Sequence, residues 1–238
     1  MNIARYLSFE INRTCDMGIQ HAKFCPNQHP ERYRYSLSKI PLNDDLIFEF
    51  WDWCVTAHHF RGIVTWSGYN EPTLVLDRIH KIMERMRAID PWQPFQIVTN
   101  RQDGAFPAFD IVKRSQYGDD PVKRSCDDGV TQLDNRIASA YGEGKPYDQA
   151  PQTGRCARGL GWEVTIDHWG NWCLCCNDWR CEESVGSIAN ESWDELFLRW
   201  KEKSRLIEWK NREEYERLPR MCRSCIDVNP GLHITRGM

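Results

Sequence analysis

Cysteine residues are concentrated in the last third of this sequence. Seven of the eleven cysteines lie between Cys156 and Cys225. Cys222 and Cys225 form a CxxC pair, whose two thiolates lie on one side of a turn and suit a zinc ion, an iron–sulfur cluster or a redox pair. Together with Cys156 and Cys175 they offer four thiolates, which suffice for a closed tetrahedral zinc site or a four-iron cluster. The spacing therefore predicts a metal site.

The composition is that of a soluble globular protein in a reducing compartment. Hydrophobic residues make up 41% and charged residues 27% of the 238 residues. An odd number of cysteines without a secretory signal argues against a disulfide framework. No window approaches the roughly 18 apolar residues of a membrane span, so we expect a cytoplasmic protein without a membrane partner. A net charge of -3 gives no reason to expect a polyanion, which disfavours nucleic acid as a partner.

A β-hairpin is predicted to position the central cysteines. The segment Trp162–Asp167 has the pattern of a strand, residues 168–171 form a turn, and a second strand leads into Cys173 and Cys175. Because side chains alternate along a strand, Cys173 and Cys175 are expected on the same face.

A long helix is predicted after the hairpin. Ser192 and Glu195 form a capping box, and the helical pattern continues to about Arg217. Hairpin and helix together predict a small α+β cysteine-rich domain. We place its boundary near Gly154, which gives a domain of residues 154–238.

The first domain, residues 1–153, alternates strands and helices. In chain order the pattern predicts a strand, a helix, a strand, a helix and a strand over Tyr6–Ile11, Asp44–His59, Gly62–Trp66, Thr73–Ile89 and Phe95–Thr99. Strands separated by helices of this length imply βαβ units, a parallel sheet and an α/β fold. Residues 102–155 are loop-rich, with one strand candidate at Phe109–Lys113.

The C-terminal pattern resembles the auxiliary-cluster domain of radical S-adenosylmethionine enzymes, of the SPASM or shorter twitch type. That family has a cysteine, a glycine followed by four residues and a cysteine, and a closing CxxC after a long insertion. Gly170 and Cys175 meet this spacing, and Asp178 resembles the family's acid past the cluster. Cys173 and Cys176 are alternative ligands, and strand alternation makes Cys173 the stronger one. The resemblance implies one auxiliary [4Fe-4S] cluster on Cys156, Cys175, Cys222 and Cys225.

The first half resembles the partial (β/α) barrel of the same family. There, a strand ends in the first cysteine of a CxxxCxxC loop that holds a [4Fe-4S] cluster. Phe9–Cys15 matches that strand, and Phe24 with Cys25 matches the loop's end, where the aromatic residue packs on the adenine. Ala22 stands where the middle cysteine would be. The ligands implied for this chain are Cys15, His21 and Cys25, since His21 is the nearest residue able to bind iron, and Asp16 is an alternative to His21.

The segment after the second strand resembles the family's G-G-E-P motif, which binds the amino group of S-adenosylmethionine. A carboxylate suits an ammonium group, and a small residue lets the backbone approach the ligand. Asn replaces the second glycine, and Asn enters the left-handed region more readily than most residues. The implied cofactor-binding residues are Phe24, Gly68, Tyr69, Asn70 and Glu71, and also Ser115, which ends a segment similar to the family's fourth strand.

The resemblance implies an enzyme that cleaves S-adenosylmethionine reductively. A cluster with three protein ligands leaves one iron for the cofactor, and electron transfer then releases a 5′-deoxyadenosyl radical. The substrate would be a peptide or a small molecule, and the electron donor a protein such as flavodoxin or ferredoxin. No catalytic residue is assigned. The alternative is a catalytically degenerate zinc or iron–sulfur protein that keeps the fold, which the missing middle cysteine favours. A zinc module for nucleic acid would explain the CxxC pair but not the first hundred residues.

Overall fold

The fold is described from a computed structural model. It describes residues 3–16, 26–67, 70–101, 103–117, 123–126, 131–133, 153–156, 162–205 and 207–224. The strands are β1 (Tyr6–Phe9), β2 (Ile63–Trp66), β3 (Phe95–Thr99), β4 (Ile111–Tyr117), β5 (Lys123–Cys126), β6 (Thr131–Leu133), β7 (Gly154–Arg155), β8 (Glu163–Ile166), β9 (Asn171–Cys173), β10 (Gly186–Ser187) and β11 (Glu208–Trp209). The helices are η1 (Pro26–Gln28), α2 (Asp44–His58), η2 (Pro72–Val75), α3 (Leu76–Ile89), α5 (Trp193–Arg205), α6 (Arg212–Glu216) and α7 (Arg220–Ser224).

One sheet connects the two halves of the chain. Its strand order is β10-β9-β8-β1-β2-β3-β4-β5-β6. The five central strands, β8 and β1 to β4, run parallel, which confirms the predicted α/β class with a mainly parallel sheet. In register, Tyr6 of β1 lies between Ile63 of β2 and Glu163 of β8. A division of the chain at residue 154, which remains a prediction, would therefore split one sheet between β8 and β1.

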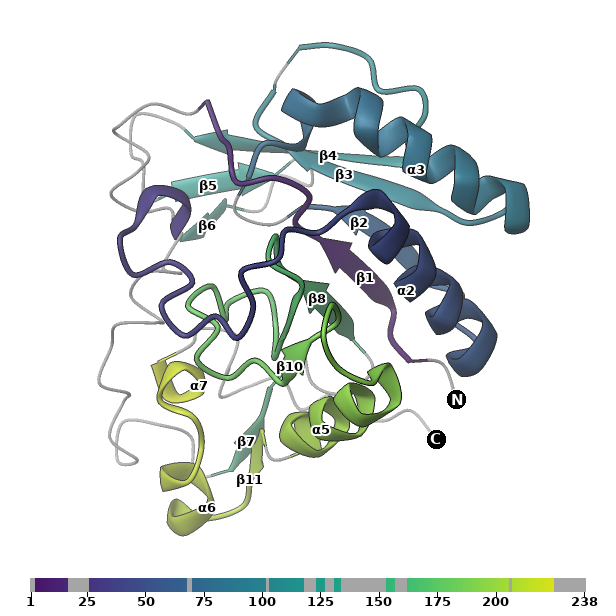
Figure 1. Ribbon diagram of the computed structural model, residues 1–238. Coiled ribbons are helices and arrows are strands. Elements are labelled where there is room, and N and C mark those ends of the chain that lie inside the picture. Colours follow the sequence, from purple (N-terminus) through teal and green to yellow (C-terminus); the bar gives the residue numbers. More distant parts are fainter. Residues whose placement is uncertain are drawn as a thin grey trace, which may run out of the picture.

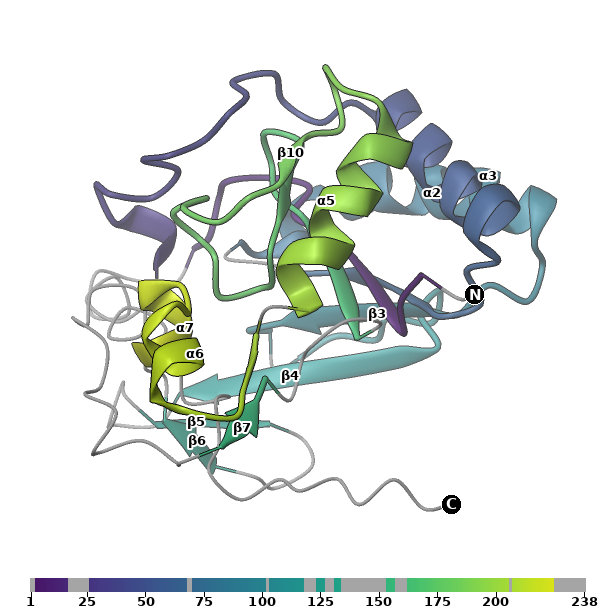
Figure 2. The same cartoon turned by 90° about the horizontal axis from the view of Figure 1, so that it is seen from below.

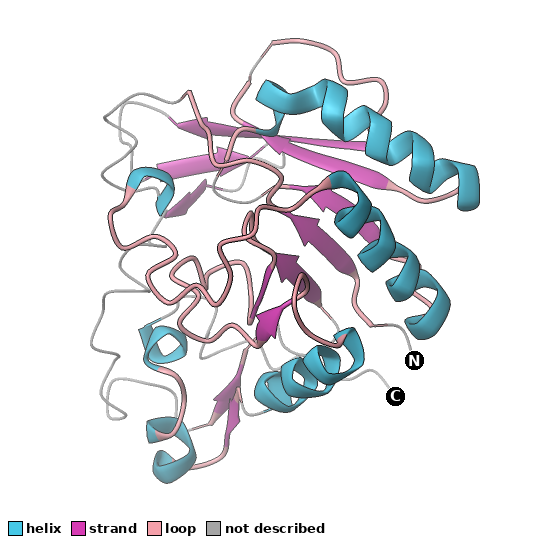
Figure 3. Cartoon of the chain, viewed as in Figure 1, coloured by secondary structure: helices cyan, strands magenta, loops and turns pink. Residues whose placement is uncertain are grey.

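The long helices and the central strands share one hydrophobic core. Asn43 caps α2 by accepting a hydrogen bond from the amide of Leu46, and Asn is one of the preferred residues at this position. The ring of Phe50 on α2 stands edge-on to Trp172 of β9 at 5.3 Å and to Trp193 of α5 at 5.5 Å. In Figures 1 and 3 the long helices α2, α3 and α5 lie on one side of the strands and most loops on the other. None of the described helices combines the length and the apolar character needed to cross a membrane.

A second, smaller core lies beside the first. Figure 2 shows α6, α7 and β7 together on the side of the molecule away from α2 and α3. The pairing of β11 with β7 holds this part together. Its buried residues are Leu174, Ile207, Trp209, Tyr215, Leu218, Met221 and Cys222.

The single long helix predicted to reach about Arg217 is wrong. Helix α5 ends at Arg205, and the chain then forms β11 before α6 begins at Arg212. The physical reason lies at the helix end, where Ile207 and Trp209 turn into the second core. A continuous helix could not bury both of these side chains in the second core and also let the backbone of Trp209 pair with β7.

Candidate functional site

The ends of β1 and β2 are joined by hydrogen bonds. The amide of Glu71, beyond β2, donates to the carbonyl oxygen of Thr14 at 2.8 Å. The side-chain amide of Asn12 donates to the carbonyl oxygen of Glu71 at 3.2 Å. Parallel sheets form their ligand sites at the carboxyl ends of their strands. These bonds therefore shape the edge at which this fold offers a binding site.

The carboxylate of Glu71 ties the same edge to β3. The side chain is fully buried. One oxygen accepts hydrogen bonds from the amide and hydroxyl of Thr73, at 3.1 and 2.7 Å, and from the hydroxyl of Thr99 at 2.6 Å. The other accepts from the backbone amide of Asn100 at 2.8 Å. The motif predicts a direct contact with the amino group of the cofactor, whereas here both oxygens bind protein donors and position two loops.

Asn70 presents an unused acceptor at this edge. Its side-chain amide donates to the Oδ1 atom of Asn12 at 2.6 Å. The orientation follows from Asn12, whose Nδ2 atom is already directed to the carbonyl of Glu71, so Asn12 can only accept from Asn70. The Oδ1 atom of Asn70 is left buried with no hydrogen-bond partner among the described residues. A buried acceptor without a donor is costly, which suits it to an N–H group of a ligand.

Cys15 lies beside these groups. Its side chain is partly exposed, and the Nδ2 atom of Asn100 approaches its sulfur at 3.8 Å. The neighbouring Asp16 forms an ion pair with Arg101, beyond β3. The structure thus brings Cys15 to the edge formed by Asn70 and Glu71. The other residues predicted at this site are outside the described residues or, for Ser115, have no described side chain: His21, Phe24, Cys25, Gly68, Tyr69 and Ser115.

Three of the four predicted auxiliary ligands lie around the second core. Cys156 follows β7, Cys175 follows β9 and Cys222 lies in α7. Cys222 is buried in this core, and both Cys156 and Cys175 pack against it. None of the three forms a disulfide. Cys225 lies outside the described residues.

Cys173 faces a different cluster from Cys175. It is buried with Tyr33 and Cys181, whereas Cys175 packs against the second core. Both residues line the cavity described below. Because β9 ends at Cys173, Cys175 lies beyond the strand on which the prediction of a shared face rests. Cys176 is partly exposed and forms no disulfide.

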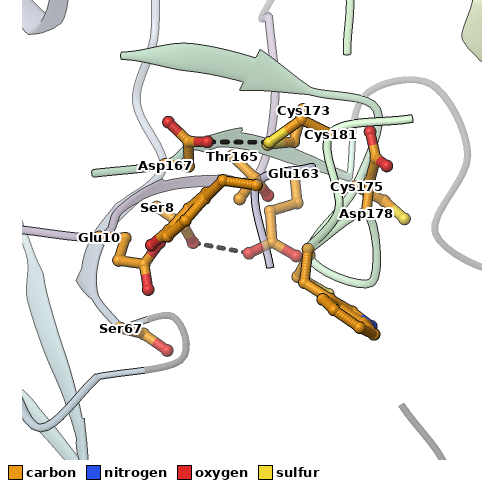
Figure 4. A pocket seen from close by; sticks show the side chains of 13 residues that line it. Ser8, Glu10, Ser67, Glu163, Thr165, Asp167, Cys173, Cys175, Asp178 and Cys181 are labelled. Atoms are coloured by element: carbon orange, nitrogen blue, oxygen red, sulfur yellow. Dashed lines mark hydrogen bonds between the residues drawn. The ribbon is translucent and has the colours of Figure 1, made fainter. Parts of the chain in front are cut away.

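A cavity of about 40 Å³ lies between the sheet and the loop that carries the cysteines. Figure 4 shows its side chains, most of which come from β1, β8, β9 and the loop after β9, with Ser67 from the end of β2. Its polar wall includes Ser8 and Glu163, whose hydroxyl and carboxylate are 2.6 Å apart. Glu10, at the same wall, is paired with Arg32 and accepts a hydrogen bond from Tyr33 at 2.8 Å. The cavity is thus polar along the strands and lined by cysteines on the opposite side.

Asp178 organises the cysteine loop from within. It is buried and accepts hydrogen bonds from the backbone amides of Leu174 at 3.4 Å and Glu182 at 2.9 Å. Burial raises the pKa of its carboxyl to about 7, although the bonds from Glu183, Leu174 and Glu182 act in the opposite direction. The acid that the sequence pattern singles out therefore shapes the loop that holds Cys175.

Sequence reasoning missed several residues of these sites. Asn12, Thr99 and Asn100 were assigned no role, yet they form the hydrogen bonds that join the strand ends. The available signal was their position at the ends of the predicted strands. Cys181 and Asp167 were also missed, although they lie next to Cys173.

Comparison with known proteins shows which solved structures share the fold of this chain. No protein-family model matches this chain, and no curated protein matches it. The matching solved structures include a selenomethionine form of BtrN in an open conformation, with a TM-score of 0.59 and 14% identity over 94% of this chain and 92% of that chain. A structure of BtrN in complex with AdoMet and 2-DOIA matches with a TM-score of 0.55 and 13% identity over 94% of both chains. At this identity the likeness establishes a shared fold.

Proposed function

We propose that this protein is a radical S-adenosylmethionine enzyme. The observation that carries the proposal is the edge at which Cys15 and the unused acceptor of Asn70 meet, within the fold of BtrN. BtrN is itself a radical S-adenosylmethionine enzyme and has been crystallised with AdoMet. We further propose that the parallel strands form a partial (β/α) barrel and that the second core belongs to an auxiliary-cluster unit of the SPASM or twitch type.

The residues at the strand ends suit the cofactor. The buried Oδ1 atom of Asn70 has no hydrogen-bond donor among the described residues, and the amino group of S-adenosylmethionine would supply one. Glu71 would act through the backbone, because its carboxylate holds the loops beyond β2 and β3 in place. We propose that a [4Fe-4S] cluster is held by Cys15, His21 and Cys25. When bound, that cluster would supply the electron for reductive cleavage of the cofactor.

The second core suits an auxiliary cluster. Cys156, Cys175 and Cys222 offer three thiols that are not used in disulfides, and thiolates are the usual ligands of iron–sulfur clusters. With Cys225 they would form a complete set of four. We retain both a peptide and a small molecule as substrate classes. A flavodoxin or ferredoxin would deliver the electron.

Replacing Asn70 by alanine is expected to weaken S-adenosylmethionine binding roughly ten- to hundred-fold. This range corresponds to the loss of one charge-assisted hydrogen bond of about 1.5–3 kcal/mol. Calorimetry on anaerobic, iron-reconstituted protein would measure the affinity. Asn190→Ala is the matched control, because Asn190 is exposed and far from the strand ends in sequence.

The same experiment on the wild-type protein tests the proposed function itself. We expect it to bind S-adenosylmethionine and, with a reductant, to release 5′-deoxyadenosine. Iron without cofactor binding would instead support the alternative of a metal-binding protein that keeps the fold. Equal affinities for wild type and Asn70→Ala would remove Asn70 from the binding site.

A further inference from the structure

Three buried side chains with metal-binding atoms converge beside the cavity. The ligand atoms of Asp167, Cys173 and Cys181 all lie within 4.8 Å of one another. The sulfur of Cys181 is 3.0 Å from the Oδ2 atom of Asp167, a contact drawn as a dashed line in Figure 4. All three residues are at least 95% buried. They are separate from the second core, against which Cys175 packs.

The backbone holds these three side chains in place. The Oδ1 atom of Asp167 accepts hydrogen bonds from the amides of Trp169 and Asn171, both at 2.8 Å, which fixes the turn between β8 and β9. Cys173 is the last residue of β9. Cys181 has a φ of 59°, a left-handed conformation that is uncommon for residues other than glycine. Such backbone conformations often mark functional sites, and this one lies at the residue whose sulfur meets Asp167.

In the part of the chain that the structure describes, no cation is paired with the carboxylates at this cluster. Neither Asp167 nor the nearby Asp178 forms an ion pair with a described Lys, Arg or His. Burial raises the pKa of Asp167. The hydrogen bond with Cys173 lowers the pKa of Cys181, but burial and the carboxylates of Asp167 and Asp178 outweigh it and raise the value to about 12. A buried carboxylate beside two thiols is unfavourable without a compensating positive charge.

We propose that Asp167, Cys173 and Cys181 bind a zinc ion. Two thiolates and one carboxylate match the ligand preference of zinc and disfavour calcium and magnesium. On binding, each thiol releases its proton to solvent, and the ion replaces the proton that now lies between Cys181 and Asp167. Three protein ligands leave a fourth position, which a water molecule in the adjoining cavity would fill.

The zinc ion would connect the sheet to the cysteine loop. Asp167 follows β8, whereas Cys181 lies in the loop that also carries Cys175. Joining them would fix this loop between the cavity on one side and the second core on the other. The inference does not depend on the proposed radical chemistry, because it rests on these three side chains alone.

Metal analysis of the full-length protein tests the proposal. The protein would be produced with zinc and iron in the medium, and each metal would be measured in the wild type and in variants. We expect about one zinc per chain, lost in Cys181→Ser and Asp167→Asn while the iron content stays unchanged. Cys54→Ala is the matched control, since Cys54 is a buried free thiol of α2 and its loss should leave both metals in place.

Zinc X-ray absorption of the iron-loaded wild type gives a second measurement that needs no variant to fold. Two sulfur ligands at about 2.3 Å and two oxygen ligands at about 2.0–2.2 Å are expected. Four sulfur ligands would overturn the proposal, because they would mean that zinc occupies the other cysteine set. A wild type without zinc, or a Cys181→Ser variant that loses iron instead of zinc, would overturn it as well.

Discussion

Replacing Cys175 by alanine is expected to abolish the proposed auxiliary cluster and to lower the melting temperature by about 8–16 °C. Among the described residues, Cys175 and Cys156 pack against the small core that contains Cys222, and Cys222 lies far from the other two in the sequence. A cross-link across a long loop contributes on the order of 4 kcal/mol. For a protein of this size, 1 kcal/mol shifts the melting temperature by about 2–4 °C.

Iron and sulfide per chain, together with thermal unfolding under anaerobic conditions, would measure both effects. For the iron content, the matched control is Cys173→Ala, which removes a thiol two residues away that packs with Tyr33 and Cys181 instead. This variant should keep the iron content of the wild type. Full iron in Cys175→Ala, or loss of iron in Cys173→Ala, would mean that the ligand set is assigned to the wrong side of the loop.

The parallel sheet was predictable because its signals are local. The runs that become β1, β2 and β3 are short, largely apolar and separated by amphipathic helices, of which α2 begins after the capping residue Asn43. The pairing of β8 with β1 was not predictable in this way. Its strand pattern is visible, but its partner lies more than a hundred residues earlier, and a local pattern carries no information about that choice.

The helix predicted to reach Arg217 failed for a related reason. Its charged residues fit a solvated helical face, and the pattern alone does not show that Ile207 and Trp209 must enter a second core. That core exists only after β7, β11 and α7 have assembled. Where burial depends on distant segments, helical periodicity is a weak guide.

At the two sites, too, the roles of the side chains depend on contacts with distant segments, which the sequence pattern does not show. The sequence identified Glu71 as a residue of the strand edge, but not that its carboxylate binds Thr73, Thr99 and Asn100. Likewise, the cysteine count indicated metal binding, whereas the division of the thiols into two groups depends on where β9 ends. Motifs give residue types at strand ends, and the hydrogen bonds decide their roles.

Replacing Arg32 by methionine is expected to destabilise the protein by about 3–5 kcal/mol, the usual effect of leaving one charge of a buried pair without its partner. The side chains of Arg32 and Glu10 are only 3% and 5% exposed. Arg32 also donates to the backbone carbonyl of Asn27 at 3.1 Å, so it joins the segment after η1 to the end of β1. In the variant, Glu10 would remain buried with Tyr33 as a neutral donor at 2.8 Å. Urea unfolding would measure the change in the free energy of unfolding.

A double variant separates the buried charge from the lost packing. Glu10→Leu combined with Arg32→Met removes both charges, and apolar pairs of similar volume often replace buried ion pairs at little cost. The double variant should therefore be more stable than Arg32→Met alone. Its change in the free energy of unfolding should then differ strongly from the sum of the changes in the two single variants. Arg34→Met is the matched control, because the side chain of Arg34 is 54% exposed in its pair with Glu31 and exposed pairs contribute about 0–1 kcal/mol. If the effects of Glu10→Leu and Arg32→Met simply add, the buried pair does not hold the segment after η1 against the sheet.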